Sequence, residues 1–527
     1  MSRLGQFVYC SILMAVGASS ATAQGGQSAF VYLVGMDTIG VERFAAGSGV
    51  SGEVVMRGQP RMTYLGGRGG GGRIEELYVV VYPPGSDSEA SPMQSARMRL
   101  VGDTVFIDIT AGGSTRTQRL GTQRDAFLLI NSSLAMLEVA VERLQSGRDT
   151  VSFPVFLTGG GQTMTAKLQR VSADSLVMQM AGMETSLILR GGRLVRVRNP
   201  AQRLVAERVD GPAAARISIG RPDYSAPSGA PYRAEHVTIP VPAGHVLAGT
   251  LTVPQGAGAR LPAVVTITGS GPQDRDEFLP LVPGFRPFRQ VADTLGRRGI
   301  IVLRLDDRGT GESTGDFSAA TSADFADDVR AAIAWLRARP DVDPAKIALL
   351  GHSEGGLIAP MVAATDARLA GIVLMAGPSK RGRDILDYQL RYGVDHDSTV
   401  APAKRDSVFA AIKTAFDTST ANLPWMKFFI PYDPMPTIRQ VKVPVLILNG
   451  ATDQQVTADQ AEVLGAALRQ AGNRDVTVRV YPDRNHLFLP DPVGNPAGYV
   501  RLPSGKIGPE VMGAIAEWLA ARLKGNT

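Results

Sequence analysis

The sequence has almost no cysteine. Its 527 residues contain a single one, Cys10, which lies in an N-terminal stretch that we expect to be removed from the mature protein. A chain without cysteine can form neither a disulfide nor a zinc–thiolate site, and it has no thiolate nucleophile. We therefore expect its stability to come from buried apolar surface.

The sequence also lacks long runs of one charge. It has 55 Lys and Arg against 49 Asp and Glu, a formal net charge of +6, and no basic cluster of the kind that contacts nucleic-acid phosphates. We therefore expect no nucleic-acid partner. Beyond the N-terminus, no apolar run reaches the roughly 20 residues that a membrane-spanning helix needs.

The first residues of the chain have the order typical of a secretory signal peptide. Arg3 precedes an apolar run over 7–16, and the small residues at 21–23 form a cleavage site. We predict a signal peptide over 1–23 that is cleaved after Ala23. The mature protein would then be exported, periplasmic or secreted, with no stable membrane span.

The remaining chain divides into two regions with different patterns. Over 27–210 short apolar segments alternate with Gly, Ser and Asp turns, and one helix is expected at about 133–144. Apolar and polar residues alternate at 164–169, as in a half-buried strand. This region is predicted to be an antiparallel β-rich domain. The stretch 211–232, rich in Pro, Ala, Gly and Ser, is predicted to be a linker.

The second region, 233–527, alternates apolar strands with helices. Near-continuous apolar strands between helices indicate a mostly parallel sheet covered on both faces, so the predicted fold class is α/β. The segment from about 379 to 440 separates two strands by more residues than a crossover helix needs. We predict that this insertion is a partly helical cap, with Trp425, Phe428 and Phe429 lining a substrate pocket.

A candidate nucleophile follows one of these strands. The apolar strand KIALL leads into Gly351-His352-Ser353-Glu354-Gly355, and a helical segment follows. A strand, a G-x-S-x-G motif and a helix in this order expose the serine hydroxyl on a strained turn at the edge of a parallel sheet. The motif occurs once in the chain. It predicts that Ser353 is a catalytic nucleophile.

A serine nucleophile needs an imidazole to accept its proton. The chain has five histidines, and His486, in the loop after the last predicted strand, is the one in a suitable position. The other four lie before the sheet core, beside the serine or in the insertion; they are His236, His245, His352 and His396.

The third member of such a triad is an acid at the end of a strand between the serine and the histidine. Asp453 directly follows the apolar strand VPVLILNG. Asp475 and Asp483 remain alternatives, although their places beside the final strand favour turns. The oxyanion of an acyl transfer needs backbone donors, for which we predict the N–H groups of Ser270 and Glu354.

Several segments together make the second region similar to a known family. They are TGSGPQDRDE, LRLDDRGTGEST, GHSEGG, LNGATDQQV and NHLF. Over 233–527 the chain resembles bacterial α/β-hydrolases of the esterase and serine-aminopeptidase-like group, especially exported esterases with a β-rich N-terminal extension. Many members have histidine where this chain has Thr268. The charges at 274–276 and 306–308 favour a salt-bridge network that ties two loops together.

The resemblance implies a carboxylic ester hydrolase that acts through an acyl-enzyme on a small-molecule ester, with no metal and no cofactor. A serine peptidase of the aminopeptidase-like or prolyl-oligopeptidase-like kind is an alternative, because the same triad cleaves amides. A binding protein that retains the fold is another. All candidate catalytic residues lie beyond the linker, so we expect the β-rich domain to be dispensable for the chemistry. Nothing in the sequence indicates an oligomeric state.

Overall fold

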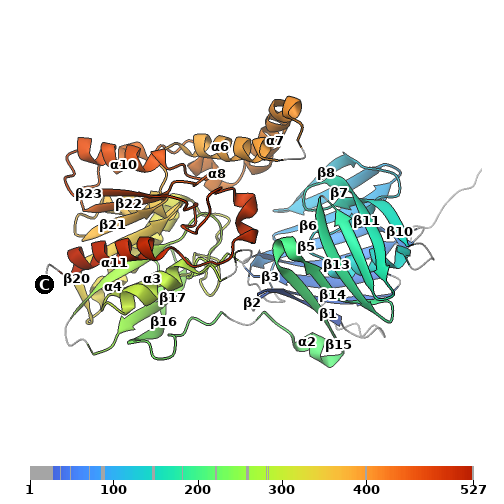
Figure 1. Cartoon of the computed structure of the whole chain (residues 1–527), viewed down its shortest axis with the longest axis horizontal. Coiled ribbons are helices and arrows are strands. Elements are labelled where there is room, and N and C mark those ends of the chain that lie inside the picture. The colour runs from blue at the N-terminus through green and yellow to red at the C-terminus, as the bar shows by residue number, and fades with distance from the viewer. Residues whose placement is uncertain are drawn as a thin grey trace, which may run out of the picture.

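The computed structural model describes residues 28–524, except 36, 48, 58, 70–71, 85–89, 145–148, 181, 220–221, 257–259, 280–281, 283 and 398–399. The predicted signal peptide over 1–23 lies outside the described residues. Within them no helix is both long enough and apolar enough to cross a membrane. Figure 1 shows two domains side by side, a β-rich N-terminal domain and a C-terminal domain in which helices cover a sheet.

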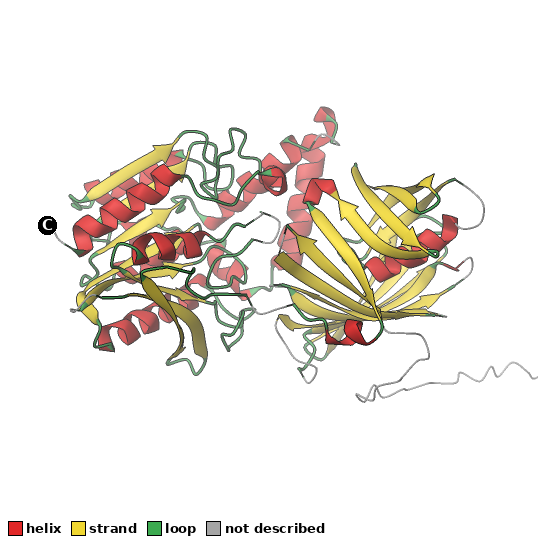
Figure 2. Ribbon diagram, turned by 60° about the horizontal axis from the view of Figure 1, so that its bottom comes forward, coloured by secondary structure: helices red, strands yellow, loops and turns green. Residues whose placement is uncertain are grey.

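The N-terminal domain is one strongly curved sheet of 15 strands (Figure 2). Neighbouring strands are antiparallel except β9 and β10, and the strands follow the order β8 to β1, then β15 to β9. Their bounds are β1 Ser28–Val34, β2 Asp37–Ala46, β3 Gly49–Met56, β4 Pro60–Arg68, β5 Ile74–Pro84, β6 Gln94–Val101, β7 Thr104–Ala111, β8 Ser114–Gly121, β9 Phe127–Leu129, β10 Thr150–Leu157, β11 Gln162–Ser172, β12 Ser175–Met180, β13 Met183–Arg190, β14 Arg193–Asn199 and β15 Leu204–Asp210.

A single apolar core fills the inside of this sheet and surrounds helix α1, Leu134–Val141. The first N–H groups of α1 are capped by the buried carboxyl of Glu42 and by the Ser133 hydroxyl. Tyr32 and Tyr64 also donate to Glu42, at 2.9 and 2.6 Å. Burial raises the pKa of Glu42, while these hydrogen bonds act to lower it. The helix can therefore begin inside an apolar core without leaving its N-terminal donors unsatisfied.

The C-terminal domain is built on an eight-stranded sheet in the order β16-β17-β19-β18-β20-β21-β22-β23. β17 is antiparallel to both its neighbours and the remaining pairs are parallel. The bounds are β16 Tyr232–Pro240, β17 Val246–Pro254, β18 Leu261–Ile267, β19 Ile301–Leu305, β20 Val342–His352, β21 Gly371–Met375, β22 Val445–Gly450 and β23 Val476–Tyr481. The predicted parallel sheet, preceded by a β-rich region, is confirmed.

Helices cover both faces of this sheet, as the apolar strands require. One apolar layer joins it to α4, α5 and α10, and the other joins it to α3 and α11, which Figure 1 shows in front of the strands. These helices span α3 Pro287–Gly296, α4 Ser322–Ala338, α5 Gly355–Ala363, α10 Asp459–Gln470 and α11 Pro509–Leu523.

The inserted segment between β21 and β22 is helical. It consists of α6 Gly382–Asp395, α7 Arg405–Thr420, α8 Pro424–Phe429 and α9 Met435–Ile438. These helices lie at the end of the sheet where the parallel strands finish, at the top of Figure 1. The insertion therefore covers the edge at which such sheets place their active sites.

The linker contains a short helix that the sequence did not predict, α2, Pro212–Arg216. Its Ala214 packs against Ala29 and Val41 of the N-terminal sheet. The linker is therefore attached to the N-terminal domain before it enters β16.

Candidate active site

Ser353 lies on the sharp turn between β20 and α5. Its φ of +52° is a left-handed conformation that residues other than glycine rarely adopt. The turn is possible because Gly351 and Gly355 have no side chains: a Cβ on Gly351 would lie 2.0 Å from the Gly355 carbonyl oxygen. The backbone strain is typical of a nucleophile elbow that presents its serine to solvent or substrate.

His486 and Asp453 meet at the same edge of the sheet. Nδ1 of His486 lies 2.8 Å from Oδ2 of Asp453, and both side chains are buried. The other oxygen of Asp453 accepts the N–H groups of Gln455 and Val456, at 2.7 and 2.9 Å. The carboxylate is thus fixed by the loop after β22. It can orient the imidazole so that Nε2 is free to act as a base.

The two alternative acids are elsewhere. Asp475 forms an ion pair with Arg522, and Asp483 is an exposed turn residue with a φ of +50°. Of the three aspartates, the structure brings only Asp453 to His486.

Ser353 and His486 open into a cavity of about 420 Å³ beneath the insertion. The insertion contributes a large part of its apolar wall: Ile385, Leu386, Phe416, Trp425, Met426 and Phe429. Trp425 and Phe429 stack on each other with ring centroids 4.5 Å apart. Phe428 differs from the sequence-based prediction, because it stacks on Tyr432 and is not among the described lining residues. Neighbours on a helix face different directions, so Phe428 and Phe429 cannot both face the cavity.

The predicted oxyanion donors line the same cavity as Ser353. Ser270 belongs to the segment 268–278 after β18, here called the oxyanion loop, and Glu354 follows the nucleophile; both line the cavity. Among the described residues, neither backbone N–H has a hydrogen-bond partner. Two unpaired donors beside a strained serine are suited to receive a developing oxyanion.

The side chain of Glu354 joins three elements. Its Oε1 accepts the Ser322 hydroxyl at the start of α4, at 2.5 Å, and the Trp425 indole N–H of the insertion, at 2.6 Å. Burial raises the pKa of Glu354, and these hydrogen bonds act to lower it. Glu354 therefore connects the insertion directly to the turn that carries the nucleophile.

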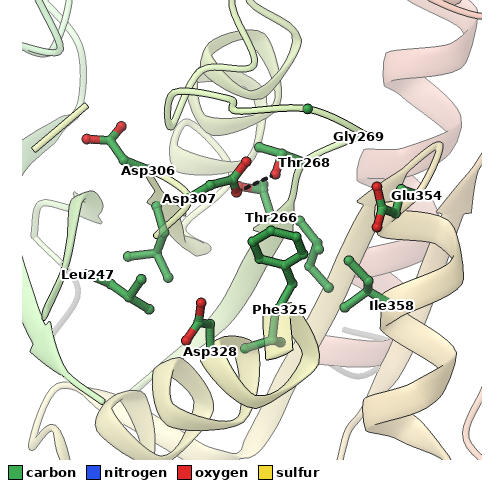
Figure 3. A pocket seen from close by; sticks show the side chains of 14 residues that line it. Leu247, Thr266, Thr268, Gly269, Asp306, Asp307, Phe325, Asp328, Glu354 and Ile358 are labelled. Atoms are coloured by element: carbon green, nitrogen blue, oxygen red, sulfur yellow. Dashed lines mark hydrogen bonds between the residues drawn. The ribbon is translucent and has the colours of Figure 1, made fainter. Parts of the chain in front are cut away.

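A second, smaller cavity of about 40 Å³ lies behind the oxyanion loop. Figure 3 shows Thr268 and Gly269 at its rim, with the Thr268 hydroxyl directed to Asp307. That hydrogen bond is 2.7 Å long, and Asp307 also accepts the N–H of Gln273 at 3.0 Å. Burial raises the pKa of Asp307 well above its usual range. Thr268 thus fastens the loop to Asp307.

The charged residues near the loop form the salt-bridge network expected from the sequence. Arg275 binds both carboxyl oxygens of the buried Asp306, at 3.0 and 2.7 Å. Arg304 binds Asp276, which is also fully buried. The network joins the oxyanion loop to the loop after β19.

Two further residues of the site were missed by sequence reasoning. Glu277 Oε1 accepts the N–H of Gly269 at 2.9 Å and lies 2.7 Å from Nδ1 of His352. Nε2 of His352 lies 3.0 Å from the carbonyl oxygen of His486. The sequence gives only weak indications of these two roles. His352 is adjacent to the nucleophile, and Glu277 is the last residue of the charged run in the oxyanion loop.

Comparisons with known proteins match the part of the chain that holds this site. The model of the prolyl oligopeptidase family matches residues 286–497, which include Ser353, Asp453 and His486. Esterase EstD of Thermotoga maritima is 27% identical over 305 residues, 56% of this chain and 69% of that protein.

Two other comparisons are more distant. Dipeptidyl aminopeptidase BIII of Pseudoxanthomonas mexicana is 27% identical over 257 residues, 46% of this chain, but the match spans only 34% of that protein. A solved structure of an esterase from Pyrococcus furiosus, 18% identical, covers 57% of this chain and 96% of its own with a TM-score of 0.41.

Proposed function

We propose that this chain, an α/β-hydrolase with ester hydrolase activity, cleaves carboxylic esters through an acyl-enzyme formed on Ser353. The predicted fold and enzyme class are confirmed by the sheet, the family match and the esterase relative. One observation carries the choice of residues: the 2.8 Å hydrogen bond between His486 and Asp453 lies beside the cavity that Ser353 lines.

In the proposed reaction, Ser353 Oγ attacks the ester carbonyl carbon while Nε2 of His486 takes the hydroxyl proton. The carbonyl oxygen becomes an oxyanion that accepts the N–H groups of Ser270 and Glu354. Collapse of this intermediate breaks the ester bond, and the alcohol leaves with the proton from His486. Water then attacks the acyl-enzyme by the same steps, which releases the acid and regenerates Ser353.

The cavity supports a small, partly apolar substrate. Its volume of about 420 Å³ lies within the range of small-molecule sites, and its aliphatic and aromatic wall suits an acyl or alkyl group. Gln389 and Gln455 add polar groups at the same cavity. We therefore propose esters with a short to medium apolar group as substrates.

The proposal is tested by the turnover of p-nitrophenyl esters of graded acyl length. Ser353→Ala should lower kcat on the order of 10⁶-fold and should abolish covalent labelling by a fluorophosphonate. Unchanged labelling of the Ser353→Ala chain would contradict the assignment of the nucleophile.

Peptide cleavage is the second candidate function. The match to the prolyl oligopeptidase family and the dipeptidyl aminopeptidase relative favour it, and a serine triad cleaves amides by the same steps. Aminoacyl anilides assayed beside the esters separate the two. A higher kcat/KM on the anilides would favour the peptidase.

Export is also part of the proposal. It is supported by the basic start, apolar run and small-residue site at 1–23. N-terminal sequencing of the protein from a periplasmic or extracellular fraction should begin at Gln24. A full-length protein that stays in the cytoplasm would contradict it.

A further inference from the structure

The oxyanion loop reaches from the active site into the other domain. Among the described residues, Phe278 is the single side chain of the C-terminal domain in the apolar core of the N-terminal domain, and it is 7% exposed. Two guanidinium groups lie over its ring, that of Arg57 of the N-terminal domain at 5.4 Å and that of Arg286 of the C-terminal domain at 4.4 Å. Phe278 thus anchors the end of the loop in the neighbouring domain.

Glu277, one residue earlier, serves the active site. Its φ of +55° is a strained, left-handed conformation. Oε1 accepts the N–H of Gly269, which directly precedes the predicted oxyanion donor Ser270, and also faces Nδ1 of His352. The strained backbone therefore allows adjacent residues to point into two different domains.

His352 connects Glu277 to the catalytic histidine. Both ring nitrogens face oxygen atoms, Glu277 Oε1 and the carbonyl oxygen of His486, an arrangement that favours the doubly protonated imidazolium, which donates to both. Burial acts to lower the pKa of His352, but the charge and hydrogen bond of Glu277 raise it above its usual value. The carboxylate of Glu277 thus holds a donor that fixes the backbone of His486.

The turn before Phe278 is itself tied to both domains. Asp274 accepts the N–H groups of Asp276 and Phe278, each at 3.0 Å. Arg286, which lies on the Phe278 ring, forms an ion pair with Asp37 of the N-terminal domain at 3.0 Å. The anchor therefore has a defined geometry on each side of the interface.

We propose that the N-terminal domain positions the oxyanion loop and the backbone of His486, through Phe278 as its anchor and Glu277 as the positioning residue. This rests on the proposed function and deepens it, because it makes the β-rich domain part of the catalytic apparatus. Oxyanion donors act within a few tenths of an ångström of their ideal place. A loop released at Phe278 would leave Ser270 free to move away from it.

The first test uses the full chain with Phe278→Ala and Phe278→Leu. Phe156→Ala is the matched control, since Phe156 is fully buried in the same core and lies on β10, which Figure 1 shows on the side of the N-terminal domain that faces away from the C-terminal domain. Turnover of p-nitrophenyl acetate and the rate of fluorophosphonate labelling are measured at a temperature where all chains are folded. We expect Phe278→Ala to lower kcat roughly 10- to 100-fold with little change in KM.

Phe278→Leu should restore most of this kcat because it keeps an apolar anchor, and Phe156→Ala should leave kcat within about twofold of the wild type. A folded Phe278→Ala chain with wild-type kcat would overturn the positioning role. Equal losses in Phe278→Ala and Phe156→Ala would also overturn it, because general loosening of the β-rich domain would then suffice.

A double-mutant cycle tests the connection through Glu277. If Phe278 acts by holding Glu277, the chain with both Phe278→Ala and Glu277→Ala should lose no more kcat than Glu277→Ala alone. Losses that multiply would overturn the connection.

The same measurements distinguish a failure of the proposed function from a failure of the positioning role. Wild-type turnover of esters with no effect of Phe278→Ala would leave the function standing and remove the positioning role. A wild-type chain that neither hydrolyses esters nor reacts with the fluorophosphonate would overturn both.

Discussion

At the scale of single residues, the carboxylate beside His486 decides how the imidazole is oriented. Asp453 is buried, and its carboxylate is hydrogen-bonded to His486, to the N–H groups of Gln455 and Val456 and to the side-chain amide of Asn449. An asparagine there could keep the backbone hydrogen bonds, but its amide group would favour the wrong tautomer of the ring.

We therefore expect Asp453→Asn to lower kcat by about 10⁴ without loss of fold. Asp483→Asn is the matched control, because Asp483 lies in an exposed turn of the same region. Steady-state turnover of a p-nitrophenyl ester checks both. If Asp483→Asn were the damaging change, the orienting acid would be misassigned.

The three triad candidates could be chosen from the sequence because each lies at or shortly after the end of a predicted strand, and parallel strands finish at one edge of the sheet. Glu277 and His352 could not. Their hydrogen bond joins positions 75 residues apart, and it requires the positive φ of Glu277, which no residue pattern reveals.

At the scale of elements, the insertion supplies a wall of the cavity. Trp425 on α8 lies in this wall and donates to Glu354 beside the nucleophile. Phe428, on the same helix, stacks on Tyr432 instead. The two aromatic residues therefore make a natural pair of substitutions.

Trp425→Ala should shift the preference for acyl length toward longer chains, since it enlarges the cavity, and should lower kcat through the lost contact with Glu354. Phe428→Ala should lower thermal stability with little effect on that preference, because it removes packing only. The ratio of kcat/KM for butyrate and octanoate esters measures the difference. An unchanged ratio in Trp425→Ala would mean that the tryptophan only packs the insertion onto the body.

A second element, the turn of the oxyanion loop, carries a carboxyl that titrates near neutral pH. Burial, with the nearby charge of Asp276, raises the pKa of Asp274 to about 6. An acid with a raised pKa binds its proton more tightly in the folded state than in the unfolded state, so above pH 6 its ionised form lowers the free energy of unfolding. This destabilisation disappears as the pH falls from about 6 toward 4, because the carboxyl becomes protonated in the folded state.

Asp274→Asn removes the titration and keeps an oxygen for the two N–H groups. Relative to the wild type, we expect the variant to gain up to about 3 kcal/mol of stability between pH 4 and pH 7.5. Asp223→Asn is a control of opposite sign, because the hydrogen bonds from Ser225 lower the pKa of Asp223. Denaturant unfolding across this pH range measures how the free energy of unfolding of each variant, relative to the wild type, changes with pH. A flat difference for Asp274→Asn would contradict the buried ionisation.

Elements were predicted unevenly. β1, β5 to β7 and β10 to β13 have enough apolar or alternating residues to indicate strands. β8, STRTQRLG, is largely exposed and polar, and it is a strand because β7 pairs with it along its whole length. Such a strand is determined by its partner, so its own residues predict little.

At the scale of the whole molecule, the linker marks where the sequence pattern changes, but not where the two domains stop interacting. Every candidate catalytic residue lies beyond 232, and on that ground the β-rich domain was expected to be dispensable. The structure places Phe278, well beyond the linker, in the N-terminal core. The sequence around Phe278 does not reveal that its side chain is buried in the other domain. From sequence alone, a phenylalanine in a loop is expected to pack in the core of its own domain.

A chain that begins near Ser225 tests the relation between the domains directly. Without the N-terminal domain, Phe278 loses its apolar surroundings and the ring no longer lies against Arg57. The oxyanion loop is then held by its contacts within the C-terminal domain, such as those of Thr268, Arg275 and Asp276. The remaining domain keeps its own two apolar layers, and we expect it to fold. Its kcat on p-nitrophenyl acetate should fall by the same factor as that of the full chain with Phe278→Ala, roughly 10- to 100-fold. Introducing Phe278→Ala into the shortened chain should then cost nothing further, because the anchor is already lost. A well-folded short chain with the full wild-type rate would show instead that the C-terminal domain orders its oxyanion loop by itself.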